Sequence, residues 1–493
     1  MGPKYSLPER WDREADVVVV GYGAAGAATA ITAHDAGAKV LILEKAPEGE
    51  EGGNSRVAGQ GWLAPAPIDR AITYFNSLAD AYAVPQDIVR VWAEEMGKNT
   101  DWIKSLGGNV VQTRQGPKEA EFPDLPGADA VKTYFVGGQR GYQSLWKLLK
   151  ASVDKRHIEV LSATPAKELI KNCPTEEIVG VVAERQGKPF RIKANRGVVL
   201  TCGGFENNEE MIRNFLTNLP YCYSIGTPYN TGDGIKMAMA VGSDLWHMNN
   251  IGGPWYYLKV PEFTAVFPIS PLHDAKEPPG GIILVGADGK RFINERCKNT
   301  HGKVKVAGRW VQAPAPCPMF IIFDHVMFSA GPLYDKNLYH GWTATLKVYD
   351  WSDDNSAELA RGWVKKGNSL AELSKKIGLD PVTVEDTINK WNTYCANGND
   401  PELGRDKMLT PIKEAPFYAM EISPTIVSTQ GGPRRNAKGQ IVRPDGSSIA
   451  RLYSAGEMGS IHSYLYQGGG NLGECVAFGR ISGRNASAEK PWD

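Results

Sequence analysis

"VVVVGYGAAGAATAITAHDAGAKVLILEK", residues 17–45, decides the fold of this 493-residue chain. Its first four residues form a continuous apolar run, which is typical of a parallel strand covered on both faces. Gly21, Gly23 and Gly26 complete a G-x-G-x-x-G motif, and the residues from 24 to 36 predict a helix. The glycines let the backbone approach a pyrophosphate at the positive end of this helix. The stretch therefore predicts a dinucleotide site.

The second strand, predicted over 40–43, is followed by Glu44, 18 residues after Gly26. A carboxylate at this place suits the ribose diol of a dinucleotide and would repel the additional phosphate of NADP. The stretch by itself leaves open whether the dinucleotide is a nicotinamide cofactor or a flavin.

Composition narrows the class of protein. Lysine and arginine total 55, and aspartate and glutamate also total 55, so net charge gives no argument for a nucleic-acid partner. No apolar run approaches the roughly 18 residues of a membrane span, which predicts no integral membrane segment. The seven cysteines form no C-x-x-C pair and the eight histidines are scattered, so we expect reduced thiols, a cytoplasmic location and no metal. Loose membrane association and the oligomeric state stay open.

Amino-acid composition and predicted secondary structure change twice along the chain. Helices are predicted over 69–106 and 143–155, with an irregular segment over 107–138 between them. The middle third is rich in Trp, Tyr and Pro and ends in a helix over 369–392, after which Gly-rich turns and short strands return. We predict an α/β fold in which a discontinuous Rossmann-like domain carries an inserted α+β domain that caps the substrate. The predicted boundaries are 1–250 and 421–493 for the first domain and 251–420 for the inserted one.

Five segments extend the prediction beyond the opening motif. They are "GGNSRVAGQGW" (52–62), "NTGDGIKMAMAVG" (230–242), "ADGKRFINE" (287–295), "LYSAGEMGS" (452–460) and "YQGGGNLGECVAFGR" (466–480). Small residues in the first suit backbone wrapped around a planar ring. Asp233 stands at the head of a predicted helix, where a carboxylate complements the helix dipole and can accept from a hydroxyl.

In this order and spacing the five segments resemble the fumarate reductase/succinate dehydrogenase flavoprotein family. Within it, "PFYAMEI" (416–422), "STQGGPRRNAKGQIVRPDGSSIARLYSAGE" (428–457) and the Tyr-x-Gly-x-Gly at 466–470 resemble 3-ketosteroid dehydrogenases. The resemblance implies FAD, and we expect it to be non-covalent because no histidine lies in the 52–62 segment. The FAD-binding residues that it implies are Gly21, Gly23, Ala24, Ala25, Gly26, Glu44, Lys45, Asn54, Ser55, Gly61, Asp233, Gly456, Glu457, Asn471 and Leu472.

Two differences from the fumarate reductases argue against reduction of a dicarboxylate. Fumarate reductases need an arginine shortly after R-F-x-N-E and a histidine just before T-x-G-G. Here Asn299 stands near the first position, although Arg296 could replace the arginine, and the second site is "VSTQGG" without histidine. A fumarate-reductase-like reductase of a small unsaturated acid therefore remains only an alternative.

For a 3-ketosteroid, the resemblance implies that the Tyr466 hydroxyl and the Gly470 amide stabilise the enolate as an oxyanion hole. Δ1-dehydrogenases also supply tyrosines for proton transfer, but the matching run "EAEFPDLPG" (119–127) contains Glu121 and Phe122 instead. The chain is thus most similar to 3-ketosteroid-Δ4-(5α)-dehydrogenases, with Δ1-dehydrogenase as an alternative. These enzymes move a hydride from C5 to the flavin and remove a proton from C4.

The proton-abstracting base stays open. Tyr464 is one candidate, and the others are Tyr134, His301, Tyr256 and Tyr257. The electron acceptor expected is a quinone, because the chain has one dinucleotide motif. A non-enzymatic flavin- or steroid-binding protein is the remaining alternative.

Aromatic residues of the middle third allow two interpretations. They either wall a flat apolar substrate slot or fill a core. The residues are Trp255, Tyr256, Tyr257, Phe263 and Phe267.

Overall fold

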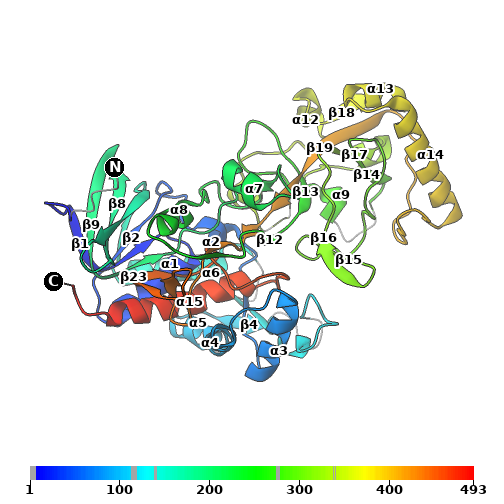
Figure 1. Ribbon diagram of the computed structural model, residues 1–493. Coiled ribbons are helices and arrows are strands. Elements are labelled where there is room, and N and C mark those ends of the chain that lie inside the picture. Colours follow the sequence, from blue (N-terminus) through cyan, green and yellow to red (C-terminus); the bar gives the residue numbers. More distant parts are fainter. Residues whose placement is uncertain are drawn as a thin grey trace. The chain divides into compact units, whose positions relative to one another are not determined.

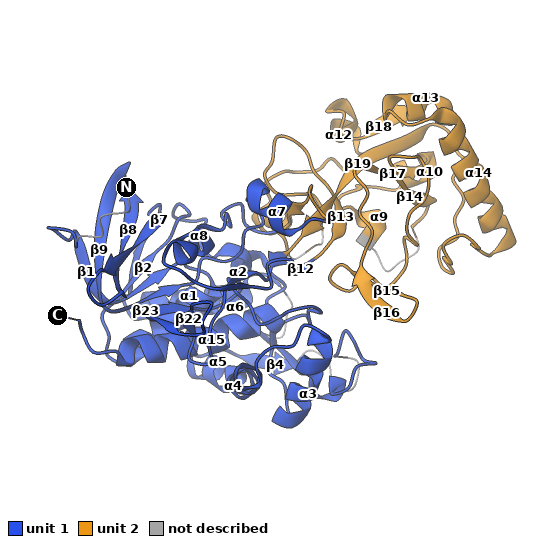
Figure 2. Ribbon diagram, viewed as in Figure 1, with its two compact units in different colours: residues 1–217, 226–252, 428–493 blue, residues 218–225, 253–427 orange. Residues whose placement is uncertain are grey.

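The computed structural model describes residues 7–112, 119–137, 141–273, 278–336, 338 and 340–492. The chain divides into two compact units (Figure 2). The first unit consists of Met1–Thr217, Gly226–Gly252 and Ser428–Asp493, and the second of Asn218–Ile225 and Gly253–Val427. The short segment of the second unit belongs there because β10 (Tyr223–Ser224) pairs in parallel with β19 (Phe417–Ile426).

A mixed sheet forms the centre of the first unit. Its strands are β22 (Gln440–Val442), β23 (Ser448–Ser454), β9 (Lys188–Leu200), β1 (Arg13–Val20), β2 (Val40–Leu43) and β6 (Glu159–Leu161), in that order. β23, β9, β1, β2 and β6 are parallel to one another, and β22 is antiparallel to β23. β7 (Ala166–Asn172) and β8 (Glu177–Arg185) extend it from β9. β1 runs parallel to both β2 and β9, and its residues 17–20 are buried. The predicted strand–helix–strand unit is confirmed by β1, α1 (Ala24–Asp35) and β2.

Helix α15 (Gly470–Ala488) packs along α1 (Figure 1). The close approach depends on glycines of α15. A Cβ on Gly479 would stand 2.8 Å from the Ala25 carbonyl oxygen, and one on Gly483 would stand 2.6 Å from that of Thr29. These contacts fix the N-terminus of α15 relative to the G-x-G-x-x-G turn.

Short elements complete the first unit. They are α2 (Gly53–Val57), α3 (Ile68–Ala79), α4 (Gln86–Gly97), α5 (Asn99–Ser105), the 3-10 turn η1 (Ala128–Ala130), α6 (Ser144–Lys155), α7 (Glu209–Phe215), α8 (Asp233–Ala240), the strand pairs β11 (Leu245–Trp246) with β21 (Gly432–Pro433) and β12 (Ile251–Gly252) with β20 (Ser428–Thr429), and the sheet β3 (Trp62–Leu63), β5 (Thr133–Val136), β4 (Val110–Gln112). The prediction of an irregular segment over 107–138 was wrong in part, because β4 and β5 lie in this segment and pair with each other antiparallel. Residues 113–118 and 138 of this segment lie outside the described residues.

The second unit is built on β19. β17 (Met319–Phe323), β13 (Trp255–Leu258) and β18 (Lys365–Gly367) pair with it antiparallel, and β14 (Ile282–Gly286) pairs with β17. Around this sheet lie α9 (Ser270–His273), β15 (Lys303–Val306), β16 (Arg309–Gln312), α10 (His325–Phe328), α11 (Trp342–Leu346), α12 (Ser356–Ala360), α13 (Leu370–Lys376) and α14 (Pro381–Asn397). The helix predicted over 369–392 is thus two helices, because Gly378 at φ +73° and Pro381 interrupt it.

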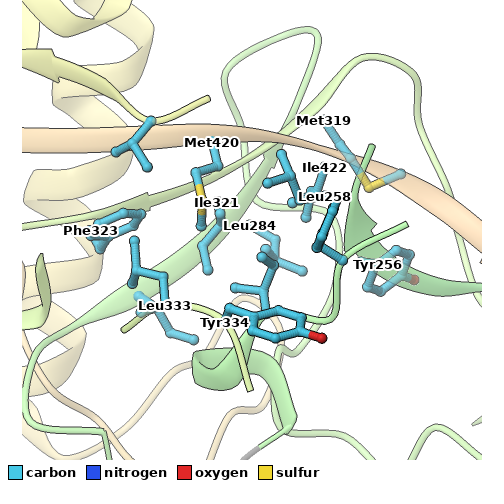
Figure 3. Packing of buried hydrophobic residues seen from close by; sticks show 14 of the residues in the cluster. Tyr256, Leu258, Leu284, Met319, Ile321, Phe323, Leu333, Tyr334, Met420 and Ile422 are labelled. Carbon is cyan, nitrogen blue, oxygen red and sulfur yellow. The ribbon is translucent and has the colours of Figure 1, made fainter. Parts of the chain in front are cut away.

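The aromatic residues of the middle third mostly fill the core of this unit. Figure 3 shows Tyr256 and Tyr334 packed among the aliphatic side chains of β14, β17 and β19. Phe267 is buried in the same cluster, and the Tyr256 hydroxyl donates to the Pro314 carbonyl at 2.6 Å. Tyr257 is buried in a smaller cluster. Of the two interpretations, core filling therefore holds for Tyr256, Tyr257 and Phe267, whereas Trp255 and Phe263 are only partly buried.

The "ADGKRFINE" segment forms a buried ion network in the second unit. Arg291 donates to both oxygens of Glu295, at 2.9 and 2.8 Å, and to Asp400 at 3.0 Å. Arg405 donates to Glu295 at 3.2 Å, and both guanidinium groups lie over the Trp391 ring. Two cations and two anions balance one another, so the network meets the requirement for burying charge.

Candidate active site and cofactor cradle

A cavity opens in the first unit where parallel strands end. It is lined by Gly21 after β1, Glu44 after β2, Thr201 after β9 and Ala455 after β23. Ligands of open α/β sheets bind at this edge. The cavity brings together eleven of the predicted cofactor residues: Gly21, Gly23, Ala24, Ala25, Glu44, Lys45, Asn54, Ser55, Asp233, Gly456 and Glu457.

The G-x-G-x-x-G turn has the backbone that its glycines predict. Gly21 has φ +103°, and a Cβ on it would stand 2.5 Å from the Thr201 carbonyl oxygen. A Cβ on Gly26 would stand 2.0 Å from the Gly21 carbonyl oxygen, so this glycine serves the packing of α1 on the turn. At the start of α1 the Ala24 amide donates to Ser55 Oγ at 3.0 Å. The positive end of α1 thus faces the cavity, where it suits a pyrophosphate.

Glu44 is fixed by the turn beside it. Its two carboxylate oxygens accept from the amides of Tyr22, at 2.8 Å, and Ala46, at 2.7 Å. Burial raises the pKa of Glu44, while these amide hydrogen bonds favour the ionised form. Each oxygen keeps a second lone pair, so the group can still accept from the two hydroxyls of a ribose.

Lys45 and Asp233 form an ion pair in the cavity wall. Lys45 Nζ donates to Asp233 Oδ2 at 2.8 Å, to the Tyr229 carbonyl at 3.2 Å and to Thr231 Oγ1. Thr231 Oγ1 in turn donates to the other oxygen of Asp233 at 3.0 Å. The pair fixes the start of α8 against the end of β2, which lies 188 residues away in sequence.

Asn54 joins two carboxyl groups deeper in the site. Its Nδ2 donates to Glu457 at 3.1 Å and to Glu206 at 3.4 Å, and its Oδ1 accepts from the Thr227 amide at 3.0 Å. Glu206 is 1% exposed, and burial raises its pKa to about 7. Burial and the charge of Glu206 raise the pKa of Glu457 as well. Two neighbouring carboxyl groups without a cation favour a shared proton.

Sequence reasoning missed Glu206. The only signal was its position two residues after Gly204, in the segment that follows the buried strand β9.

Tyr466 and Asn471 stand at the turn that opens α15. The Tyr466 hydroxyl is largely buried and accepts from the Asn471 amide at 3.3 Å. Asn471 Nδ2 donates to Ser428 Oγ at 3.2 Å and to Glu457 Oε1 at 3.4 Å. Burial raises the pKa of Tyr466, so the hydroxyl keeps its proton at neutral pH. Accepting from the Asn471 amide does not use this proton, because a phenol can both accept and donate.

The other predicted residues have different surroundings. The Gly470 amide donates to the Gln467 carbonyl at 2.9 Å, so the turn already uses the group that the sequence assigned to the substrate. Tyr464 lies against the ring of Tyr82 at a centroid distance of 5.2 Å. Leu472 is buried beside Asn471 in α15.

Gly61 serves packing rather than lining the cavity. A Cβ on Gly61 would stand 2.6 Å from the Phe135 ring.

The "EAEFPDLPG" run (119–127) lies against the turn that precedes α15, at residues 467 and 468. The Glu121 carboxylate accepts from the Gly468 amide at 2.6 Å, and the Glu121 amide donates to Gln467 Oε1 at 3.0 Å. Gln467 Oε1 also accepts from the Tyr74 hydroxyl at 2.8 Å. Sequence reasoning missed Gln467 and Tyr74, because nothing local marks a contact across more than 300 residues.

The remaining candidates for the base lie elsewhere. Tyr134 is on β5, with its ring stacked on Trp62. His301 belongs to the second unit, where its ring meets Trp255 at 5.5 Å. Asn299 binds backbone at both ends of its side chain, donating to the Pro254 carbonyl at 3.1 Å and accepting from the Gly302 amide at 2.7 Å. Asn299 therefore holds a turn of the second unit.

Two negative findings concern the described part of the chain. None of its helices is both long and apolar enough to cross a membrane. No group of three or more His, Cys, Asp or Glu side chains in it is placed to hold a metal ion.

Comparison with known proteins gives one family match. The model of the FAD binding domain family matches residues 16–472. A probable fumarate reductase of Shewanella frigidimarina is 26% identical over 491 residues, which cover 96% of this chain and 74% of that protein. The 3-oxosteroid 1-dehydrogenase of Mycolicibacterium smegmatis is also 26% identical, over 97% of this chain and 98% of that protein.

Solved structures share the fold. The 3-ketosteroid Δ1-dehydrogenase of Sterolibacterium denitrificans has a TM-score of 0.75 at 21% identity, covering 97% of this chain and all of that one. The 3-ketosteroid-Δ4-(5α)-dehydrogenase of Rhodococcus jostii has a TM-score of 0.61 at 22% identity, covering 98% of each chain.

Proposed function

Because the chain belongs to the FAD binding domain family and is an FAD-dependent oxidoreductase, we propose that it dehydrogenates 5α-saturated 3-ketosteroids to 4-ene-3-ketosteroids. The observation that carries the proposal is the buried Tyr466 hydroxyl, joined through Asn471 to Glu457 in the wall of the cofactor cavity. A hydrogen-bond donor beside the cofactor is what the enolate of a ketone requires.

The cradle fits FAD by its donor set. The glycine turn and the start of α1 suit the pyrophosphate, and Glu44 suits the adenosine ribose. Asn54, Asp233 and Glu457 supply polar groups for the remaining hydroxyls. No histidine in the 52–62 segment offers a covalent link, so we propose non-covalent FAD. When bound, FAD would supply the hydride-accepting chemistry, and we propose a quinone or similar carrier as the electron acceptor.

Tyr466 polarises the substrate in this proposal. Its hydroxyl donates to the C3 carbonyl oxygen and stabilises the negative charge that develops when the C4 proton leaves. The Asn471 amide orients the hydroxyl by donating to its oxygen. Burial excludes water from the hydroxyl, so the hydrogen bond strengthens as charge develops on the substrate.

The choice of Δ4 over Δ1 rests on the 119–127 run. Its Glu121 and Phe122 stand where the Δ1-dehydrogenases resembled by this chain supply tyrosines. A chain that keeps the donor for the 3-keto group but lacks those tyrosines fits removal of the C4 proton better than removal of a proton at C2.

The alternative is reduction of a small unsaturated acid, which the similarity to a fumarate reductase favours. It requires a cation that grips a carboxylate. At the two positions where the fumarate reductases carry an arginine and a histidine, this chain has Asn299, which binds backbone, and Ser428, whose Oγ accepts from Gln430 and Asn471. The first proposal therefore has the better support.

An anaerobic titration tests the proposal. The holoenzyme is titrated with 5α-androstane-3,17-dione, and separately with 4-androstene-3,17-dione, while the oxidised-flavin absorption band is followed. Bleaching by the saturated steroid alone is the expected result. Bleaching by the 4-ene steroid would replace Δ4 with Δ1, and no bleaching by either would refute steroid dehydrogenation.

A further inference from the structure

Glu206 lies directly behind the wall of the cofactor cavity. It is 1% exposed, whereas Asn54 and Glu457 line the cavity. Asn54 Nδ2 donates to Glu206 Oε1 at 3.4 Å and to Glu457 Oε2 at 3.1 Å. One amide nitrogen therefore bridges a buried carboxyl group and a carboxyl group of the cavity wall.

The hydrogen bonds of Glu206 suit a carboxyl group that carries a proton. Its Oε1 accepts from the Thr429 amide at 2.8 Å as well as from Asn54. Its Oε2 is buried and has no hydrogen-bond partner among the described residues. A negative charge on an oxygen without a donor costs much more free energy in the interior than a neutral hydroxyl does. The geometry therefore favours the protonated form of Glu206.

Within the described residues no lysine or arginine donates to either carboxyl group. Glu457 accepts from the neutral side-chain amides of Asn54 and Asn471. Burial raises the pKa of Glu206 to about 7, and burial together with the neighbouring Glu206 raises the pKa of Glu457. Two neighbouring carboxyl groups lose their second proton at a higher pH than an isolated carboxyl group does. The pair thus keeps one proton where other carboxyl groups are ionised.

The other charged groups around the cavity are balanced by partners of their own. Lys45 and Asp233 form an ion pair at 2.8 Å. Arg435 forms a buried ion pair with Glu474 of α15. The carboxylate of Glu44 accepts from two backbone amides. These contacts leave the Glu206–Glu457 pair without a counter-ion from this set.

The thiols and phenols near the cavity stay neutral around pH 7. Burial raises the pKa of Cys202 and of Tyr229 to about 12. It raises the pKa of Tyr22, Tyr466 and Cys475 as well. No histidine is among the described residues that line the cavity. The Glu206–Glu457 pair is therefore the group expected to titrate near neutral pH.

We infer that Glu206 is a positioning residue for the cofactor, which acts through Asn54 and Glu457 to keep a proton in the cavity wall and to limit the negative charge that meets the phosphates of FAD. Loss of this proton would place a second negative charge in a cavity that receives a cofactor with two phosphate charges. The pKa of the pair is then higher with FAD bound than without it, so FAD binding weakens as pH rises through this range. This role of Glu206 does not depend on the substrate, and failure of the steroid titration would leave it intact.

The pH dependence of FAD release from the holoenzyme tests this role. The dissociation constant is measured on dilution at pH 6.0 and pH 8.5, at constant ionic strength, from the fluorescence of released flavin. The wild-type protein is expected to bind FAD about tenfold more weakly at pH 8.5 than at pH 6.0. Glu206→Gln keeps an oxygen for the Thr429 amide and leaves Glu457 as a single carboxylate. It is expected to bind FAD equally well at both pH values.

Two further variants complete the experiment. Glu206→Ser, a second neutral variant, should also remove the pH dependence. Glu48→Gln removes an exposed carboxylate near Lys45 and should keep the wild-type ratio of the two dissociation constants. A purely structural role of Glu206 would weaken FAD binding at both pH values without changing that ratio. The wild-type ratio in either neutral variant that retains FAD, or equal affinity of the wild type at both pH values, would overturn the inference.

Discussion

Replacing Tyr466 with phenylalanine removes the hydroxyl and leaves the ring in place. Loss of a single oxyanion donor costs about 2.7–4 kcal/mol in the transition state, which corresponds to about a 100- to 1000-fold lower rate. The buried position supports the full range, because water has little access to replace the donor. The lost bond from the Asn471 amide is long at 3.3 Å, so we expect a stability cost of about 1 kcal/mol and a fall in Tm of about 1–2 °C.

The assay for Tyr466→Phe is anaerobic stopped-flow reduction of the flavin by 5α-androstane-3,17-dione. Tyr82→Phe is the control, since it removes the hydroxyl of an exposed tyrosine. Because burial raises the pKa of Tyr466, ionisation of this residue should not lower the wild-type rate below about pH 10. A Tyr466→Phe rate within about threefold of wild type would refute the assignment of the donor. An equal loss in Tyr82→Phe would show that the effect is not specific to Tyr466.

The remaining predictions concern the cradle. Glu44→Ala removes the acceptor at the ribose position and should weaken FAD binding at least tenfold, measured by the fluorescence of released flavin; unchanged retention would contradict the role of Glu44. Gly26→Ala should prevent assembly of the holoenzyme because its Cβ would stand 2.0 Å from the Gly21 carbonyl oxygen, whereas Gly97→Ala, with no atom nearer than 3.7 Å, should leave thermal stability nearly unchanged. Burial raises the folded-state pKa of Glu206 to about 7, so the apoprotein should lose stability as pH rises from about 4.5 through 7. Glu206→Gln should flatten that dependence in thermal melts, and an unaltered pH profile would argue that the carboxyl group of Glu206 ionises normally.

The cofactor end of the site was predictable from sequence because its signals are local. A strand, a glycine turn and a helix follow one another between residues 13 and 35, and each constrains the next through backbone geometry. Glu44 follows directly from the end of β2, and Asp233 from the start of α8. Their position in the cavity wall needed no knowledge of distant contacts.

The reacting end was less predictable because its contacts join distant segments. The bond between Gly468 and Glu121 spans 347 residues, and that between Tyr74 and Gln467 spans 393. In the second unit, the hydrophobic pattern of the sequence also could not distinguish residues that fill the core from residues that line a substrate site. An aromatic-rich sequence around Tyr256 and Phe267 is expected for either role. Only the neighbours of these residues in the folded chain show that they fill the core.

Asn471 links the two ends of the site. Its backbone amide holds the Tyr466 hydroxyl, and its side chain reaches Glu457, which shares the Asn54 side chain with Glu206. The first residues of α15 are therefore fixed by the same hydrogen bonds that shape the cofactor cavity. A hydroxyl held in this way keeps a constant distance to the cradle, and a donor for a developing oxyanion needs that constancy because reorganisation during the reaction would offset its benefit. The reaction that such a cradle supports then depends on the few groups around Tyr466.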